Sequence, residues 1–218
     1  MSLGSIARSV LGEELFPKVG RLYRAVFVDL QKVAESFPVP PPGAAVLDIG
    51  GGDGEALKPY LDRHPEVRVT MIDLKPSIGT ALTPEQRQRV ELLPATSIRD
   101  LAATGRHRPD MIILSDVLHH IPAAQREAFF GDIRALLDGR AATLVIKDVE
   151  PGRWRATLGY LADRYISGDR NVQQIGQRAM TELVQRVFPR STCQATALIE
   201  RDPPNYTLVF TLPGRVSA

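Results

Sequence analysis

Glycines and acidic residues gather in one short stretch of this chain, and together they could hold a small ligand. The stretch follows the apolar run at 45–47 and precedes a helix that is expected to begin near Glu55. Glycine tolerates positive φ angles and lets a ligand lie against bare backbone, while the first turn of a helix carries unpaired N–H groups. The sequence therefore predicts a turn that binds its ligand largely through the main chain. Its residues are Asp48, Gly50, Gly51, Gly52, Asp53 and Gly54.

A further carboxylate lies at the spacing expected for a contact with ribose. Asp73 ends the apolar segment 67–72 and follows Gly54 by nineteen residues. In a parallel βαβ unit, an acidic residue at this place lies beside the ribose of a bound nucleotide. The glycine spacing differs from the G-x-G-x-x-G dinucleotide fingerprint, and a glycine turn alone is also compatible with an ordinary tight connection. The turn and Asp73 together predict a ligand that contains ribose.

Apolar runs alternate with helical patterns along the chain, and this alternation predicts a doubly wound, Rossmann-like α/β fold. A short proline-rich turn separates the last two strands, so they are expected to form an antiparallel hairpin on an otherwise parallel sheet. The carboxyl ends of parallel strands share one edge, where open α/β sheets bind ligands. Seven strands are expected, at 45–49, 67–73, 90–94, 111–114, 142–146, 192–199 and 206–211. Helices are expected at 5–37, 55–63, 98–103, 122–138, 154–165 and 171–188.

The proline-rich connector at 38–43 divides the chain into two parts. Residues 1–43 are expected to form a helical extension or lid that ends in this connector, because proline cannot continue a helix. Residues 44–218 are expected to form the ligand-binding domain, with a variable segment for the substrate at 151–190.

Composition is that of a soluble globular protein with an ordinary core. The chain has 218 residues, 44% of them hydrophobic and 24% charged, and its net charge is +2. These interspersed charges argue against a dedicated nucleic-acid surface. The lone Cys193 fits a reducing compartment, no apolar run is long enough to span a membrane, and acidic residues at 13 and 14 argue against a signal peptide. A cytoplasmic location is expected.

Four segments, taken in order, resemble the motifs of class I S-adenosylmethionine-dependent methyltransferases, in the version common among enzymes that act on small molecules. The first two are the glycine turn at 48–54 and Asp73. The third is the segment 110–122, which reads DMIILSDVLHHIP, and the fourth is 144–148, which reads LVIKD. The resemblance implies that S-adenosylmethionine is the cofactor and that the sheet closes with a reversed seventh strand.

The resemblance also implies which residues hold the cofactor. The glycine turn would admit its methionine part, and Asp73 would accept both ribose hydroxyls. The backbone of Ser115 and Asp116 would lie near the sulfonium. The family often has an acidic residue that reads the adenine amino group, but this sequence places Thr96 and Ser97 there. The implied cofactor-binding set is Asp48, Gly50, Gly51, Gly52, Asp53, Gly54, Asp73, Leu74, Thr96, Ser97, Ser115 and Asp116.

Candidate catalytic residues are His119, His120 and Asp148. One of the histidines could act as a general base, because imidazole titrates near neutrality, although capping or packing would also explain the pair. Asp148 follows a buried strand and is expected to open onto the acceptor pocket as a base or orienting carboxylate, or else to cap a loop. Its neighbour Lys147 is expected to be solvated. Adjacent helical histidines point about 100° apart, so no metal site is expected.

The function that follows is metal-independent transfer of a methyl group from S-adenosylmethionine to a small molecule. Oxygen is the favoured acceptor atom, with nitrogen and carbon also open. Two alternatives remain: a nicotinamide-dependent oxidoreductase on the same fold, and a non-catalytic domain that binds S-adenosylmethionine or a protein partner. The lack of a Tyr-x-x-x-Lys pattern argues against the oxidoreductase, and the intact glycine turn and ribose carboxylate argue against the non-catalytic domain.

Overall fold

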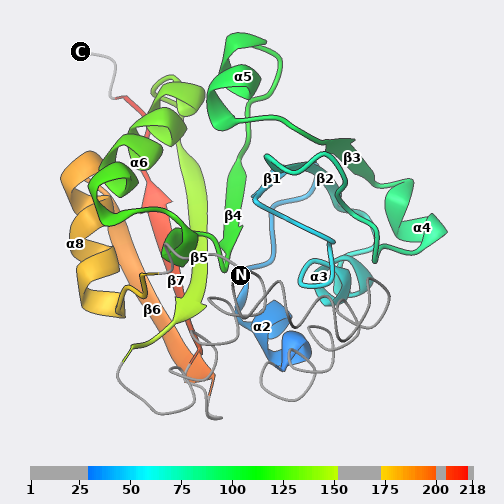
Figure 1. The fold of residues 1–218 in the computed structure, drawn as a ribbon, viewed down its shortest axis with the longest axis horizontal. Helices are drawn as coiled ribbons and strands as arrows, with labels where there is room; N and C mark the ends of the chain where they lie inside the picture. The colour runs from blue at the N-terminus through cyan, green and yellow to red at the C-terminus, as the bar shows by residue number, and fades with distance from the viewer. Residues whose placement is uncertain (1–28, 152–172, 200–204, 216–218) are drawn as a thin grey trace, which may run out of the picture.

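A computed structural model describes residues 29–151, 173–199 and 205–215. These residues form one seven-stranded sheet in the order β3-β2-β1-β4-β5-β7-β6 (Figure 1). Strands β1 to β5 are parallel, and β7 runs antiparallel to both of its neighbours. The predicted doubly wound fold with a closing hairpin is confirmed. The strands are β1 (Ala45–Ile49), β2 (Arg68–Ile72), β3 (Val90–Leu93), β4 (Met111–Ser115), β5 (Ala142–Val149), β6 (Thr192–Ile199) and β7 (Asn205–Leu212).

Helices cover both faces of the sheet, because its central strands are apolar on both sides. On one face, buried side chains of α5 (Ile98–Ala103), α6 (Ala123–Leu137) and α8 (Gln177–Val187) join those of the strands in a single cluster. On the other face, α2 (Leu30–Ser36) and α3 (Lys58–Arg63) contribute to a second cluster. The short helix α4 (Pro84–Arg87) leads into β3.

The strand order changes direction between β1 and β4, and this change locates the site. From β1 the chain builds outward through β2 to β3, then returns to place β4 on the other side of β1. Connections that leave the two strands in opposite directions open a crevice outside their carboxyl ends. The glycine turn follows β1 at this crevice, and a short 3-10 helix (Leu118–His120) follows β4 there.

Two helices begin later than the sequence predicted. The helix expected near Glu55 begins at Lys58, because the N–H groups of Leu57 and Lys58 both donate to the carbonyl of Gly54 and form turns first. The helix expected from position 171 begins at Gln177, after Gly176 in an extended conformation. The expected helix at 154–165, most of the one at 5–37 and most of the final turn lie outside the described residues.

Candidate functional site

The glycine turn is held together by its own N–H groups. The N–H of Gly50 donates to the carbonyl of Ile72 (2.8 Å), and that of Gly52 donates to Oδ2 of Asp73 (3.0 Å). The N–H of Gly54 donates to the carbonyl of Gly51 (3.0 Å). These three N–H groups are therefore already bonded within the protein, and the binding of a ligand by the main chain of the turn stays a prediction. The bonds give the turn a fixed shape.

Three glycines of the turn serve different purposes. A Cβ on Gly51 would collide with the Asp48 carboxylate and the Met71 side chain, so this position is filled. A Cβ on Gly54, which has φ +85°, would meet Leu82 at 2.9 Å. Gly52 has φ +55° and nothing within 4 Å of its added Cβ, so it borders open space. Gly52 is thus the place where the backbone is both bare and accessible.

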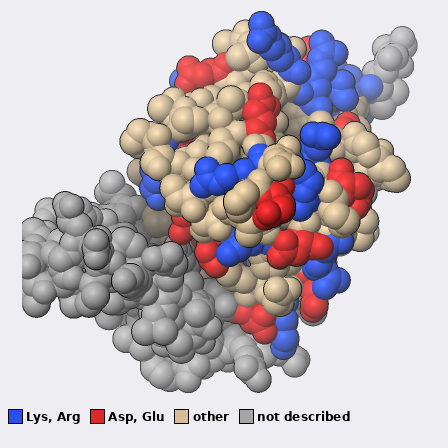
Figure 2. Space-filling view, turned by 90° about the vertical axis from the view of Figure 1, so that its right-hand side faces the viewer, with Lys and Arg blue, Asp and Glu red and all other residues tan. Residues whose placement is uncertain are grey.

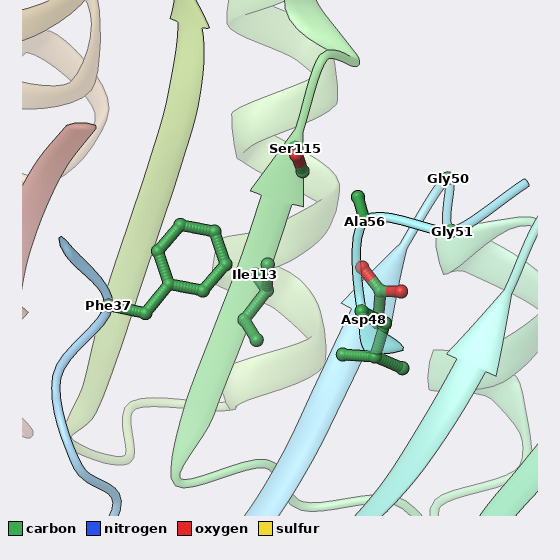
Figure 3. Close-up of a pocket in the computed structure, with 8 residues that line it drawn as sticks. Phe37, Asp48, Gly50, Gly51, Ala56, Ile113 and Ser115 are labelled. Atoms are coloured by element: carbon green, nitrogen blue, oxygen red, sulfur yellow. The ribbon is translucent and has the colours of Figure 1, made fainter. Parts of the chain in front are cut away.

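A small pocket opens between the glycine turn and the end of β4 (Figure 3). The Asp48 carboxylate lies at the end of β1 with 4% of the residue exposed. Burial and, next, the charge of Asp73 raise the pKa of Asp48 to about 7. The buried hydroxyl of Ser115 makes no hydrogen bond, so it can accept or donate one to a ligand. The pocket is lined by Phe37, Asp48, Gly50, Gly51, Ala56, Leu57, Ile113 and Ser115.

Asp73 is fixed at the edge of the crevice by two main-chain N–H groups. One carboxylate oxygen accepts from Gly52, and the other accepts from Lys75 (2.9 Å). Each oxygen keeps a second lone pair, so both ribose hydroxyls could still be accepted. The next residue, Leu74, is 76% exposed and offers an uncovered apolar surface for a flat ring.

The side chains of Thr96 and Ser97 are already engaged within the protein. The Thr96 hydroxyl donates to the carbonyl of Pro94 (3.0 Å). The Ser97 hydroxyl caps α5, because it accepts from the N–H of Asp100 and donates to the Asp100 carboxylate. Asp53 is engaged as well, since its Oδ1 accepts from the N–H of Glu55 (3.1 Å). The predicted adenine contact at Thr96 and Ser97 stays a prediction and would use main-chain groups.

Two acid–base pairs meet at the carboxyl ends of β4 and β5. The ammonium of Lys147 contacts both carboxylate oxygens of Asp116, at 2.6 and 2.7 Å. Lys147 is 1% exposed, so the expectation that it is solvated is wrong. Partial burial favours the neutral form of Asp116, but the charges of Lys147 and then His119 outweigh it, so the pKa of Asp116 is lowered. Asp116 has φ +59°, a strained conformation for a residue other than glycine.

The second pair joins His119 to Asp148. Nδ1 of His119 lies 2.7 Å from Oδ1 of Asp148, and both side chains are buried. Asp148 is 0% exposed, so the expectation that it opens onto the acceptor pocket is wrong; it lies behind the imidazole and orients it. His120 is exposed, and its ring centroid lies 4.2 Å from that of His119. His119 thus has a buried carboxylate partner of the kind that orients a general base.

One donor atom each of Asp116, His119 and Asp148 lies within 4.8 Å of the other two. Three such donors could in principle surround a cation, and sequence reasoning missed the group because it compared only the adjacent histidines. The Lys147 ammonium already occupies both oxygens of Asp116. The expected absence of a metal stays a prediction.

Hydrogen bonds hold two segments, 149–151 and 173–177, beside His119. Oε2 of Glu150 accepts from the N–H of Gln177 at the start of α8 (2.9 Å). The N–H of Gln173 donates to the carbonyl of His119 (2.8 Å). The buried guanidinium of Arg126 donates to the carbonyls of Leu118 and Gln173. The end of β5 and the start of α8 are therefore fixed next to the 3-10 helix Leu118–His120, here called the histidine turn.

Residues 47–141 match the sequence profile described as "Methyltransferase domain". Over these residues the chain is similar to methyltransferase domains, and its sheet has the fold of solved methyltransferases. The match spans β1 to the end of α6, and so includes the glycine turn, Asp73 and the histidine turn. None of the helices in the described ranges combines the length and apolar character needed to cross a bilayer.

Parts of this chain are similar in sequence to known methyltransferases. Phenazine-1-carboxylate N-methyltransferase of Pseudomonas aeruginosa is 27% identical over 109 residues, which cover 48% of this chain and 31% of that protein. O-demethylpuromycin-O-methyltransferase of Streptomyces alboniger is 25% identical over 150 residues, covering 67% and 40%. The chain also superposes on an O-methyltransferase family 2 protein of Planctomyces limnophilus with a TM-score of 0.63, at 21% identity, covering 84% of this chain and 56% of that one. The chain thus spans about a third of the first relative's length and about half of the solved structure.

Proposed function

We propose that this chain binds S-adenosylmethionine and transfers its methyl group to a small-molecule acceptor, with oxygen as the favoured acceptor atom. The observation that carries this proposal is the Asp73 carboxylate, which anchors Gly52 and borders the open space that Gly52 leaves uncovered. The two curated relatives methylate small molecules, as their names state, and this supports an acceptor of the same kind.

The described residues fit the cofactor. Asp73 would hold the ribose hydroxyls, and the exposed Leu74 would lie against the adenine. Gly52 leaves room beside the turn, since a Cβ there would point into open space. Asp48 and the Ser115 hydroxyl supply polar groups for the methionine part, which carries an ammonium and a carboxylate. When bound, the cofactor supplies a methyl group activated by positively charged sulfur.

On the acceptor side, the chain's own task is to orient the acceptor and take up its proton. Asp148 fixes the His119 ring through Nδ1, so proton uptake would use the other ring nitrogen, Nε2. Because Asp148 is buried and lies 2.7 Å from Nδ1, it would stabilise the imidazolium that forms. In this proposal His119 is the base and Asp148 is a positioning residue, while His120 takes no direct part.

Other features of the whole protein are proposals of the same kind. Residues 1–43 would form the helical extension and 44–218 the catalytic domain, with the segment 151–190 adapted to the acceptor. The face shown in Figure 2 mixes Lys and Arg with Asp and Glu, which supports a small-molecule partner over a nucleic acid. We place the protein in the cytoplasm, with neither a metal nor a membrane partner.

Gly52→Ala tests the proposed cofactor position against a matched control. Gly52 and Gly105 have φ of +55° and +62°, and neither has an atom within 4 Å of an added Cβ. Alanine at either position costs a similar left-handed strain, about 1 kcal/mol. Only Gly52→Ala should place a methyl group where the cofactor lies, weakening binding by roughly ten- to a hundredfold. Calorimetric titration with S-adenosylhomocysteine measures the difference.

The outcome of this comparison is decisive because Gly105 lies on the connection into the amino-terminal end of β4, away from the crevice. Equal dissociation constants for Gly52→Ala and wild type would remove the proposed cofactor position. Titration with NADH is the accompanying control, and binding of NADH without binding of S-adenosylhomocysteine would support an oxidoreductase instead.

Asp148→Asn tests the proposed base. The substitution keeps Oδ1, which also accepts from the N–H of Val149, but removes the charge that favours the imidazolium. We expect turnover to fall by about a hundredfold while cofactor affinity changes little. The acceptor for this assay would be identified by mass spectrometry of small molecules that co-purify with the protein. Normal turnover in Asp148→Asn would retire His119 and Asp148 as the proton-accepting pair.

A further inference from the structure

Lys147 is a charged side chain that the proposed mechanism leaves unused. It lies on β5 between Ser115 of β4 and Thr207 of β7, and only 1% of it is exposed. A buried ammonium is costly unless it is paired. Lys147 pays this cost by contacting both oxygens of Asp116, while its own carbonyl accepts the N–H of Asp116 (2.9 Å). Side chain and main chain of one lysine therefore fix one aspartate.

Asp116 would otherwise compete with Asp148 for the histidine. One oxygen of Asp116 and one nitrogen of His119 lie within 4.8 Å of each other, while Oδ1 of Asp148 lies 2.7 Å from Nδ1 of the same ring. An imidazole beside two free carboxylates holds its proton more tightly than one beside a single carboxylate. An imidazole that holds its proton more tightly is protonated more of the time at neutral pH, so it is a poorer base. What distinguishes the two aspartates is that Asp116 is already paired.

We propose that Lys147 is a positioning residue for the proton-accepting pair: its ammonium holds Asp116 away from His119, so that Asp148 is the carboxylate, among the described residues, that is bonded to the imidazole. The left-handed conformation of Asp116, φ +59°, fits this role, because the strained residue is held by three contacts with Lys147. The consequence for catalysis rests on the proposed function, whereas the pairing itself does not.

The other charged groups near His119 are the same in every variant below. They come from each described element that packs around the histidine turn. They are His120 of the turn itself, Asp148 and Glu150 at the end of β5, Arg126 of α6 and Tyr206 of β7.

Histidine NMR measures the pairing without cofactor or acceptor. The chain has four histidines, so the His119 signal can be assigned by its loss in His119→Gln. We expect the titration midpoint of His119 to rise by about one pH unit in Lys147→Met, and to fall by a similar amount in Asp116→Asn. In the double variant Lys147→Met/Asp116→Asn, both charges are gone and the midpoint should return close to that of wild type. Lys147→Arg should leave it nearly unchanged.

These variants separate an electrostatic role from a merely structural one. Loss of structure would make the double variant at least as abnormal as either single one, so a midpoint that fails to return would overturn the proposal. An unchanged midpoint in Lys147→Met would overturn it as well. Asp116 keeps 40% of its side chain exposed, so water can solvate it in Lys147→Met and this variant should fold. If it does not fold, Asp116→Asn compared with the double variant gives the same answer.

Two controls complete the experiment. Lys58→Met removes a partly exposed lysine of α3 that pairs with Glu55, and it should leave the His119 midpoint unchanged. Wild-type protein treated with a chelator should titrate as before, and added Zn²⁺ should not suppress the titration. Suppression by Zn²⁺ would mean that a metal takes the place assigned to Lys147. Failure to bind S-adenosylhomocysteine would contradict the proposed function, but it would not affect the pairing of Lys147 with Asp116.

Discussion

Replacement of Asp48 by asparagine is expected to stabilise the folded protein at pH 8 and to weaken cofactor binding at the same time. Burial and the charge of Asp73 raise the pKa of Asp48 from 3.8 to about 7, so ionisation of this carboxyl opposes folding. Three pKa units correspond to roughly 4 kcal/mol, and a buried asparagine amide costs roughly 1–2 kcal/mol of this gain. The net stabilisation at pH 8 is therefore about 2 kcal/mol.

The pH dependence identifies the cause. Between the ordinary pKa of 3.8 and the folded value of about 7, the folded protein binds a proton that the unfolded chain has released. The stability of the wild type therefore falls as pH rises through this window and levels off above it. The gain from Asp48→Asn should be full at pH 8 and much smaller at pH 5. Urea unfolding at the two pH values measures it, with Asp132→Asn, at a partly exposed aspartate that pairs with Arg99, as the control. An equal gain at both pH values would contradict the raised pKa.

Cofactor binding should respond to the same substitution in the opposite sense. An ionised Asp48 attracts the ammonium of the methionine part, so the wild type should bind S-adenosylhomocysteine more tightly at pH 8 than at pH 6. Asp48→Asn should lose this pH dependence and bind more weakly at pH 8. A carboxylate that destabilises the fold but favours the ligand is a common feature of binding sites.

Asp73→Ala should weaken cofactor binding by more than tenfold, the equivalent of more than about 1.5 kcal/mol. The variant loses the charge-assisted hydrogen bonds to ribose, and it also releases the N–H groups of Gly52 and Lys75, which anchor the turn. The measurement is the dissociation constant of S-adenosylhomocysteine by calorimetry.

Asp73→Asn is the matched control for this second effect. Its amide oxygen can still accept the N–H of Gly52, so the turn is expected to keep its conformation while the charge is lost. Affinity intermediate between wild type and Asp73→Ala would separate the anchoring of the turn from the contact with ribose. A dissociation constant unchanged in Asp73→Ala would contradict the ribose assignment.

The sequence predicted the strands well, because these depend on local patterns. The apolar run at 45–49 and the capped segment at 98–103 form β1 and α5 with the predicted bounds. The edge that gathers Asp48, Asp73 and Ser115 follows from parallel strands alone.

The electrostatic arrangement could not be predicted, because it joins residues far apart in the chain. Asp116 and Lys147 are 31 positions apart, and His119 and Asp148 are 29 apart. Nothing local distinguishes Lys147 from a lysine that ends a strand in solvent. The hydrogen bonds within the glycine turn could not be predicted either, since only the structure shows that neighbouring carbonyls and the Asp73 carboxylate accept its N–H groups.

Two hydrogen bonds described above have a practical consequence for engineering. One joins Gln173 to the carbonyl of His119, and the other joins Glu150 to the start of α8. The segments 149–151 and 173–177, on either side of residues 152–172, are held by these hydrogen bonds between described residues. Chimeras that exchange the intervening segment with that of a relative should therefore be joined at 151 and 173. Junctions at or between these positions keep both hydrogen bonds. A junction that replaces Gln173 would remove its hydrogen bond to His119 and so disturb the histidine turn.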